Sequence, residues 1–391
     1  MKFDKVVYIR YFPLTKAIYT DLYFEQLLEN NVKVEYLDLT SLFFPAQNFN
    51  DSFQFNGNIK INNYKELKRY FKLQNNDRVL YISIMTLEWR VLKLFRLITK
   101  LNLTIGVFAR GVFPKAELSK TSRLIHYNRV INLKRIVSFL KNKTLRVFKI
   151  KGYIKNYDYV FKAGDFGYWG IGVGNDFDLN YANIIEVNTV DYDDFLREKD
   201  EENNNNNNQI VFLDQYLPYH PDVAFLKMKT VEPEKYYNEL NSFFERLENQ
   251  TGKNVVIAAH PKAEKYHQFN PFNGREIYFN KSNELVKGSF FVLTHDSTSV
   301  CYPICYKKRI VLLDSSYLLE VFPDMCLTIS GIMNSAGATK INMDDTGCLV
   351  IPEKINLEIY NEYKFKYLTS KISEKTISEI IFLNFILGNN K

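Results

Sequence analysis

Three groups of polar residues in the second half of the chain could carry chemistry, and each directly follows a short apolar run. Asp214 follows Ile210 to Leu213, and a carboxylate there can take a proton from a hydroxyl as a general base. His260-Pro261-Lys262 follows Val255 to Ala259, and the histidine and the lysine can bind a phosphate and stabilise the charge on a departing nucleotide. Pro261 would fix the backbone that aims the ring of His260.

The third group follows the run from Phe290 to Leu293 and opens the next predicted helix. It contains Ser297, Thr298 and Ser299, and hydroxyls with free N–H groups at a helix start form a phosphate site. Each group also has a structural interpretation, since loop carboxylates and serines often cap backbone amides. The coincidence of all three with strand ends favours a ligand site, because open α/β sheets bind ligands there.

The elements that must position these groups follow a regular alternation of strands and helices, which predicts βαβ units and parallel sheets. The helical segments, marked by three-to-four spacing of apolar residues, are 19 to 28, 87 to 101, 233 to 249 and 373 to 387. The strand-like runs are 6 to 9, 32 to 39, 79 to 84, 103 to 108, 159 to 162, 184 to 187, 210 to 213, 255 to 259, 277 to 279, 290 to 294 and 310 to 313.

A segment that contains six consecutive asparagines, Asn203 to Asn208, has nothing to bury and divides the two halves. It predicts a linker at 198–209 between an N-terminal domain, 1–197, and a C-terminal donor domain, 210–350. A helical segment, 351–391, is expected to pack back toward the N-terminal domain. The fold class expected is α/β, with two Rossmann-like domains and the ligand in the cleft between them.

The ordered set of a strand-end acid, an HP dipeptide and an S/T cluster resembles the C-terminal half of bacterial GT-B sialyltransferases and related ulosonic-acid transferases. The resemblance covers about Ile210 to Asp314. It implies that Asp214 is the base, that His260 contacts the phosphate or cytidine of a CMP-sugar, and that the S/T cluster binds the phosphate. The implied enzyme is an inverting, metal-independent glycosyltransferase.

The sequence departs from that family directly after the acid, where Gln215 and Tyr216 stand in place of a second acid and a glycine. Asp222 and His220 are therefore alternative bases. The HP and T-x-x-S/T elements also resemble the polymerases that transfer glycerol phosphate from CDP-glycerol. Both families release CMP, and a UDP- or GDP-sugar enzyme of the same fold is a further alternative.

The first half offers candidates by position only. Arg10 and Arg110 follow predicted strands and are expected on the acceptor side. D-x-D patterns occur at Asp176 to Asp178 and Asp191 to Asp193, and we interpret both as structural loops, so no metal is predicted. The four cysteines lack C-x-x-C spacing, which indicates neither a zinc site nor a disulfide framework.

The segment Lys115 to Lys155 holds twelve Lys and Arg residues against one acid, Glu117, although the whole chain carries only +7. Such a patch indicates an anionic partner, and the apolar spacing from Leu133 to Leu140 is typical of a basic amphipathic helix on anionic lipid. A solvated surface helix is the structural alternative. A non-enzymatic nucleic-acid-binding protein is a second class, although no nucleic-acid motif appears.

The composition is that of a globular protein, with 46% hydrophobic and 15% aromatic residues. The start of the chain, with Lys2, Asp4 and Lys5, lacks the pattern of a secretory signal, and the apolar run from Ile380 to Leu387 is too short to span a bilayer. We therefore expect a cytoplasmic, peripheral enzyme at the inner face of a bacterial membrane. It would transfer an acidic sugar, sialic acid-like or Kdo, to a surface polysaccharide or lipid-linked glycan such as capsule or lipopolysaccharide.

Overall fold

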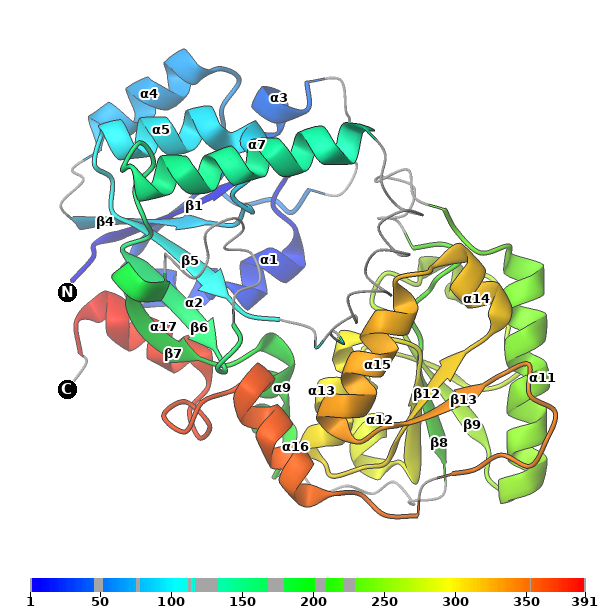
Figure 1. Ribbon diagram of the computed structural model, residues 1–391. Helices are drawn as coiled ribbons and strands as arrows, with labels where there is room; N and C mark the ends of the chain where they lie inside the picture. Colours follow the sequence, from blue (N-terminus) through cyan, green and yellow to red (C-terminus); the bar gives the residue numbers. More distant parts are fainter. Residues whose placement is uncertain are drawn as a thin grey trace. The chain divides into compact units, whose positions relative to one another are not determined.

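The computed structural model describes residues 2–45, 52–74, 78–111, 114, 116, 133–167, 179–200, 209–220, 229–351 and 353–389. The chain forms two compact units (Figure 1). The first comprises residues 1–112, 123–190 and 369–391, and the second comprises residues 113–122 and 191–368. The Asn-rich segment, Asn203 to Asn208, lies outside the described residues.

The first unit contains a sheet in which, within the described residues, every paired strand is parallel and the order is β3-β2-β1-β4-β5-β6-β7. Its central strands are nearly all apolar and buried, as expected for a parallel sheet covered on both faces. The strands are β1 Lys5–Arg10, β2 Lys33–Asp38, β3 Asn58–Lys60, β4 Val79–Ser83, β5 Ile105–Ala109, β6 Tyr159–Ala163 and β7 Asn183–Val187.

Helices cover both faces of this sheet, and the side chains of each strand alternate between two buried clusters. On one face Leu67 and Phe71 of α4, Leu94 of α5 and Leu145 of α7 pack against the strands, whereas Phe24 of α2 packs on the other. The bounds are α1 Lys16–Asp21, α2 Phe24–Glu29, α3 Thr40–Phe43, α4 Tyr64–Leu73, η2 Trp89–Val91, α5 Leu92–Lys100, α7 Leu133–Ile150 and α17 Ser378–Leu387.

The last helix, α17, belongs to the first unit although it ends the chain. Its Phe382, Phe385 and Ile386 are buried with β6 and the start of the chain. The backbone N–H groups of Lys2 and Phe3 both donate to the carbonyl of Ile386, at 3.0 Å. The beginning and the end of the chain are thus part of one hydrophobic core.

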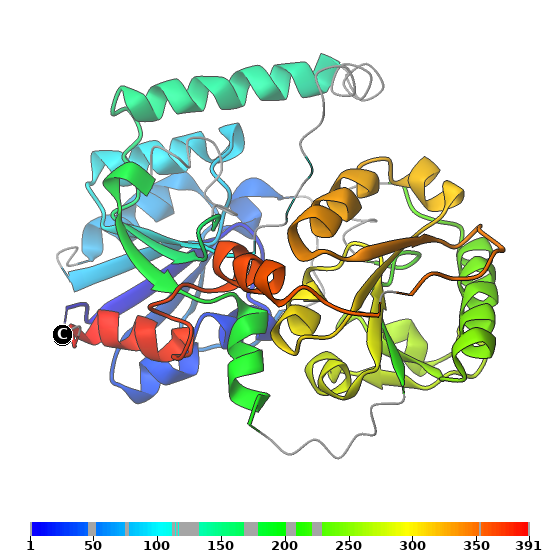
Figure 2. The ribbon, with the colours of Figure 1, turned by 60° about the horizontal axis from the view of Figure 1, so that its bottom comes forward.

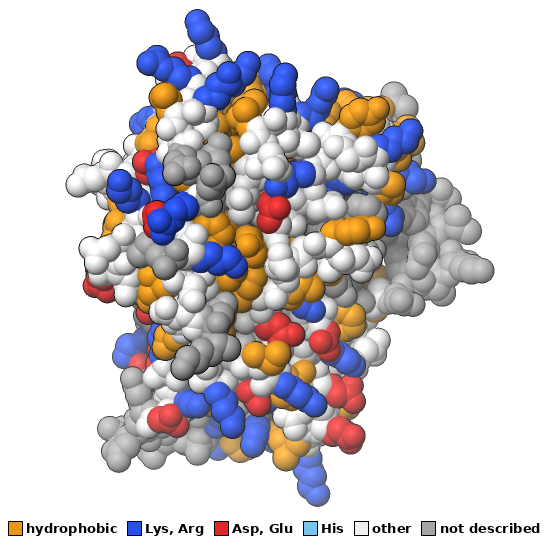
Figure 3. Space-filling model, turned by 90° about the vertical axis from the view of Figure 1, so that its left-hand side faces the viewer, with side chains coloured by type: hydrophobic (Ala, Val, Ile, Leu, Met, Phe, Trp, Pro, Cys, Tyr) orange, Lys and Arg blue, Asp and Glu red, His pale blue; other side chains and the backbone are white. Residues whose placement is uncertain are grey.

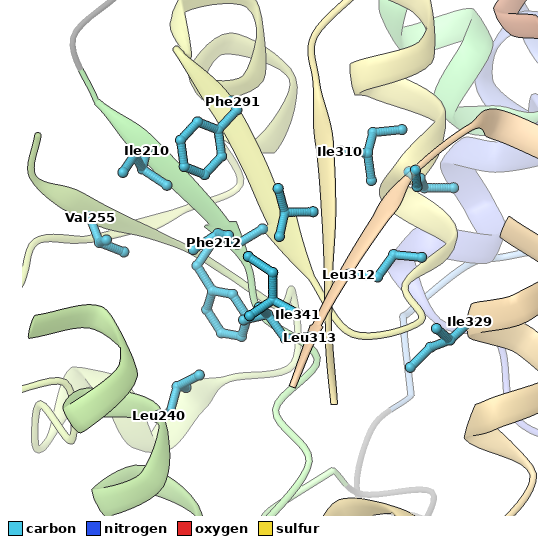
Figure 4. Close-up of a cluster of buried hydrophobic side chains, with 14 of the residues drawn as sticks. Ile210, Phe212, Leu240, Val255, Phe291, Ile310, Leu312, Leu313, Ile329 and Ile341 are labelled. Atoms are coloured by element: carbon cyan, nitrogen blue, oxygen red, sulfur yellow. The ribbon is translucent and has the colours of Figure 1, made fainter. Parts of the chain in front are cut away.

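The second unit contains a sheet with the order β10-β9-β8-β11-β12-β13 within the described residues, again parallel at every pair. Its core, shown in Figure 4, gathers side chains of these strands against α11 (Pro233–Thr251) and α15 (Met325–Ala336), including Leu240 and Ile329. The strands are β8 Ile210–Leu213, β9 Val255–Ala259, β10 Ile277–Phe279, β11 Phe291–Thr294, β12 Ile310–Asp314 and β13 Thr339–Asn342.

The longest helix described in this unit, α11, begins at Pro233 and ends at Thr251. Glu232 caps its first turn by accepting from the N–H groups of Glu234 and Lys235, and Gly252 closes it with a left-handed φ of 64°. The other helices are α9 Val190–Glu198, η3 Glu264–His267, α12 Ser282–Gly288, η4 Thr298–Val300, α13 Cys301–Cys305, α14 Ser316–Val321, α15 Met325–Ala336, α16 Leu357–Tyr363 and η5 Lys364–Leu368.

The expected fold class, α/β with two Rossmann-like parallel sheets, is confirmed. The single helix predicted over 19 to 28 was wrong, because Tyr23 adopts a left-handed φ of 63° and separates α1 from α2. The strands β3 and β13 were not predicted, since both are short and partly polar. Of the described helices, none is long and apolar enough to cross a membrane.

Candidate functional site

The strand order of the second unit places its crevice between β8 and β11. From β8 the chain continues to β9 on one side, whereas β11 lies on the other, so these neighbours form the point at which the strand order reverses. Ligands of open α/β sheets bind outside the carboxyl ends of the strands at such a point. Leu213 is in register with both Ala258 and Thr294, so the residues that follow all three strands share one edge.

Asp214 lies at the floor of this edge, with only 4% of its surface exposed. Its backbone N–H donates to the carbonyl of Ala258, and its Oδ2 accepts from the Tyr266 hydroxyl at 3.1 Å. Its Oδ1 has no hydrogen-bond partner of ordinary geometry among the described residues. Burial raises the pKa of this carboxyl to about 6, against the opposing effect of the nearby Tyr216 N–H group. The group is mostly ionised near neutral pH and can accept a proton.

Two tyrosines hold Asp214 from behind. Because Tyr266 donates its hydroxyl proton to the carboxylate, the 2.8 Å bond between the two tyrosine hydroxyls must be donated by Tyr237. Tyr237 comes from α11 and Tyr266 from η3. Neither residue was among the predicted site residues, and the signal available was the tyrosine pair Tyr236-Tyr237 on α11.

His260 directly follows β9 and is half-buried beside His220, with the ring centroids 4.9 Å apart. Its Nδ1 accepts from the backbone N–H of Lys262 at 3.1 Å, so in the neutral ring the proton is on Nε2. Lys262 and Pro261 are exposed at the same turn. A histidine named only as an alternative base, His220, therefore lies against the histidine named for phosphate binding.

The S/T cluster forms the short turn η4 after β11. Ser297 caps it, because its hydroxyl accepts from the Ser299 N–H at 3.2 Å. Thr298 is exposed and Ser299 is half-buried. The cap uses one hydroxyl in the structural way that the sequence also allowed, and it leaves the exposed Thr298 hydroxyl at the same strand edge as His260 and Asp214.

Gln215 links the two sides of the crevice. Its side-chain amide donates to Asp296 Oδ1 at 2.9 Å, and its Oε1 accepts from the Asp296 backbone N–H at 3.1 Å. This reciprocal pair ties the end of β8 to the end of β11. The residue that departs from the family pattern therefore has a structural role, because an amide, unlike an acid, can donate to Asp296.

His295, inside the same motif, is fully buried and structural. Its Nδ1 lies 2.8 Å from the Leu313 carbonyl, which only accepts, so Nδ1 carries the proton and Nε2 accepts from the Tyr236 hydroxyl at 3.0 Å. Burial lowers the pKa of this imidazole. The neutral ring joins β11, β12 and α11 beneath the candidate site.

Backbone strain is also present at this edge. Tyr216, two residues after Asp214, has a left-handed φ of 56°, which is costly for a residue with a large side chain. Its ring is buried against Tyr219 and Tyr266, and its hydroxyl accepts from the Lys265 N–H at 3.3 Å. The conformation turns the chain sharply after β8 and fixes the loop that carries His220.

The two arginines predicted on the acceptor side make internal contacts in the first unit. Arg10 ends β1 and donates to the Pro13 carbonyl at 3.3 Å. Arg110 follows β5 and donates to the Tyr23 hydroxyl at 2.9 Å and to the Asp21 carbonyl at 2.7 Å. Arg110 thereby holds the connection between α1 and α2, and nothing in the structure tests an acceptor role for either residue.

Within the described ranges, no group of three or more His, Cys, Asp or Glu side chains could hold a metal ion. Of the D-x-D patterns, Asp191 and Asp193 lie in the first turn of α9, where Asp193 is buried. Asp176 to Asp178 and the alternative base Asp222 lie outside the described residues.

No family model matches the sequence, and no curated protein matches it. Solved structures match over almost the whole chain. The glycosyltransferase of kitacinnamycin shares 9% identity at a TM-score of 0.41, covering 99% of this chain and 95% of its own. A variant of the wall teichoic acid polymerase TagF shares 11% identity at a TM-score of 0.49, covering 99% and 89%.

The UDP-GlcNAc 2-epimerase from Methanocaldococcus jannaschii, solved with UDP-GlcNAc and UDP, shares 13% identity at a TM-score of 0.42, covering 99% of this chain and 100% of its own. Identities this low, with TM-scores below 0.5, carry no argument about activity. The argument for function therefore depends on the strand-end residues.

Proposed function

We propose that the chain is a glycosyltransferase that takes a sugar from a nucleotide-activated donor bound at the strand-end edge of the second unit. The observation that supports this most is the convergence of Asp214, the His220–His260 pair and Ser297 to Ser299 on one edge, at the point where the strand order reverses. A base and a phosphate-binding group at one crevice are what such a transfer needs.

In the proposed reaction, the acceptor hydroxyl attacks the anomeric carbon of the donor sugar in line with the departing nucleotide. Asp214 takes the proton of the acceptor hydroxyl, and the bond between the anomeric carbon and the phosphate oxygen breaks. His260 donates a hydrogen bond from Nε2 to that phosphate, where negative charge develops, and Lys262 and Thr298 supply further donors. The tyrosine pair behind Asp214 holds the carboxylate in place.

The proposal leaves open which nucleotide activates the donor sugar. The acid, HP and S/T motifs resemble enzymes that use CMP-activated acidic sugars, whereas the similar epimerase structure holds UDP-GlcNAc and UDP. We propose the coarser class, a nucleotide-sugar donor, and treat CMP and UDP as the two leading donors, with CDP-glycerol transfer as the remaining alternative. The acceptor proposed is a glycan or a lipid-linked saccharide, and no metal cofactor is invoked.

The test is thermal stabilisation by CMP, CDP, UDP and GDP, because a ligand that binds only the folded state raises its melting temperature. We expect one nucleotide to stabilise the protein and His260→Ala to lose that shift. His267→Ala is the matched control, since His267 is exposed on the same β9–β10 connection but stacks on Phe279, with the ring centroids 3.9 Å apart. The control should keep the shift.

The pattern across nucleotides then selects the donor. A shift with CMP directs the assay to CMP-sugars, a shift with UDP directs it to UDP-sugars, and release of nucleotide in the presence of a sugar donor measures transfer. If no nucleotide stabilises the protein, or if both histidine variants lose the shift equally, the strand-end edge is not the donor site and the proposal fails.

A further inference from the structure

A groove of about 850 Å³ lies on the surface of the first unit, and no residue of the candidate site lines it. Its walls come from α4, from η2 and α5, and from the turn after α7. None of the described residues that line it is acidic. The lining residues that carry charge are Lys68, Arg90, Lys93, Arg96 and Lys100, and the aromatic ones are Tyr64, Trp89 and Tyr153.

The cations are arranged in a row rather than scattered. Lys93, Arg96 and Lys100 stand at i, i+3 and i+7 on α5, one face of a helix over about 10 Å, and Lys68 of α4 lines the same groove. In the part of the chain that the structure describes, Lys68, Arg96 and Lys100 have no ion-pair partner, whereas Arg90 lies 3.3 Å from Glu88. Uncompensated charge lining a groove attracts an anionic partner.

Aromatic side chains connect this groove to α7. Trp89 packs near Phe148 of α7, with the ring centroids 6.4 Å apart, and Phe148 packs near Tyr153 at 5.8 Å. The two outer rings of this aromatic series reach solvent, since Trp89 is 37% and Tyr153 is 59% exposed. Tryptophan and tyrosine with one face buried and one wet are typical of the boundary between lipid and water.

The helix α7 itself presents apolar side chains to solvent. Val137, Leu140, Val147 and Ile150 are all exposed, at spacings of three, seven and three residues, which place them along one side of the helix. Leu145 faces inward and is fully buried in the core of the unit. The 18 residues of α7 include no acid, and Lys143 and Arg146 are exposed among the apolar residues.

Groove and helix lie on the same side of the first unit. Figures 1 and 2 show α4, α5 and α7 covering one face of its sheet, while α17 covers the other. In Figure 3, Lys and Arg side chains gather with apolar side chains between them along the upper edge, the side of α4 and α5 in Figure 1. We call the groove residues and the exposed residues of α7 together the α4–α5–α7 face.

A soluble polyanion and a protein partner would each match only one of the two features of this face, the cations or the exposed apolar side chains. A soluble polyanion would use the row of cations but would leave Leu140 and Ile150 exposed. A protein partner with an apolar surface would cover those side chains but would not neutralise the groove. A bilayer with anionic lipids supplies both phosphate groups and an apolar interior in one surface.

We propose that the α4–α5–α7 face docks on an anionic lipid bilayer, with lipid phosphates in the groove and the exposed side chains of α7 entering the acyl boundary. The docking concerns the first unit alone and does not depend on the reaction at the second. It places the face at the membrane surface and involves no membrane-spanning helix.

The first experiment is sedimentation of the full chain with vesicles of phosphatidylcholine alone or mixed in equal parts with phosphatidylglycerol. We expect binding only to the mixed vesicles, falling as salt is added. The groove variant is Lys68→Ala with Arg96→Ala and Lys100→Ala. Each lost cation should weaken partitioning roughly five-fold, the equivalent of about 1 kcal/mol.

The matched control removes the same charge elsewhere, by Lys281→Ala with Lys371→Ala and Lys375→Ala, all at exposed lysines outside the α4–α5–α7 face. It should bind like the unchanged protein. A helix variant, Leu140→Ser with Val147→Ser and Ile150→Ser, should weaken binding at least ten-fold while keeping the melting temperature, because these side chains contribute little to the core.

A second readout follows Trp89 directly. The chain has two tryptophans, so Trp169→Phe leaves Trp89 as the sole emitter. Its emission should shift to the blue with mixed vesicles and should stay unchanged with the groove variant. Equal binding by the groove and control variants would overturn the proposal, as would sedimentation that ignores phosphatidylglycerol. Binding of dextran sulfate without vesicle binding would instead assign the groove to a soluble polyanion.

Discussion

At the scale of single residues, the candidate site combines a buried carboxylate with a half-buried histidine pair. Asp214 is held by Tyr266 at the bottom of the strand-end edge, whereas His260 and His220 lie where solvent reaches them. Burial gives the carboxylate a higher pKa, which strengthens it as a base relative to an exposed aspartate. The buried charge of Asp214 also lowers the stability of the folded state. Such a loss is expected at a group kept for chemistry rather than for stability.

Asp214→Asn should therefore abolish transfer without destabilising the protein. The pKa of Asp214 rises from 3.8 to about 6 on folding, so ionisation above pH 6 costs the folded state on the order of 3 kcal/mol. The asparagine keeps the acceptor for Tyr266 and removes the buried charge. Urea unfolding at pH 7.5 should give an equal or higher free energy of unfolding.

The rate of transfer should also depend on the ionisation of Asp214. With Asp214 as base, kcat/KM for transfer should increase as pH rises through about 6 and then level off. A rate that stays flat across that range, or an asparagine variant that keeps its activity, would remove Asp214 from the role of base and leave His220 as the next residue to test.

His295 gives a pH dependence of the opposite sign. Its pKa is lowered by burial, so on acidification the unfolded chain takes up a proton at about 6.5 before the folded one does. The His295 contribution to stability is complete above pH 6.5 and is lost as the pH falls below it. His295→Asn, which keeps a donor for the Leu313 carbonyl, should flatten this dependence.

His295→Asn should also lower the free energy of unfolding by about 1–3 kcal/mol at pH 7.5, because the buried Tyr236 hydroxyl then lacks its acceptor. Urea unfolding of the second unit at pH 7.5 and at pH 5.5 measures both effects. The difference between wild type and variant should be smaller at the lower pH, and a difference that grows on acidification would contradict the neutral assignment of the ring.

At the scale of elements, the turns between helices and strands decide where functional side chains stand. The sharp turn at Tyr216 follows β8, and the turn at Lys307 leads from α13 into β12. Both residues have a left-handed φ, a backbone conformation that raises the free energy of any residue with a Cβ. At Tyr216 the ring packs among other tyrosines, so the strain is compensated there, whereas Lys307 is exposed.

Lys307→Gly should therefore stabilise the second unit by about 1 kcal/mol, because glycine adopts its φ of 55° without strain. Lys307→Ala is the matched control, since it removes the charge and the long side chain but keeps the Cβ. Only the glycine variant should shift the urea midpoint upward. An equal gain in both variants would mean that the lysine side chain, and not the backbone, carries the cost.

At the scale of the whole molecule, the first unit is built from three separate stretches of chain, of which the last is residues 369–391. Buried polar groups attach this last stretch to the rest of the unit. The backbone N–H of Asn188 donates to Ser378 Oγ at 2.8 Å, and Asn188 Oδ1 accepts from the Thr369 hydroxyl at 2.6 Å. Apolar residues of α17 then complete the core around β6.

Phe382→Ala should cost the first unit about 3–5 kcal/mol, as expected for deleting a fully buried phenylalanine. Ile380→Ala, on the same helix but 46% exposed, should change stability by no more than about 0.5 kcal/mol. Hydrogen exchange resolves the two units, and the Phe382 variant should accelerate exchange in β1 and β6 while β8 and β9 stay protected. Uniform acceleration would show that the units unfold together.

The sequence by itself determined the alternation of strands and helices, the two parallel sheets and the residues that follow each strand, because these depend on short-range patterns of burial. Those patterns therefore indicate Asp214, His260 and Ser297 to Ser299 as candidate site residues. The sequence also indicated that the segment around α7 is basic and amphipathic, since that pattern is contained in a single helix.

Only the tertiary structure decided which of these residues meet. The pairing of His220 with His260, the support of Asp214 by Tyr266 and the link from Gln215 to Asp296 join residues 40 or more positions apart or on different strands. Such contacts depend on strand order and register, which local patterns do not encode. The same holds for α7, because only packing against the sheet determines that Leu145 is buried and that Leu140 and Ile150 remain outside.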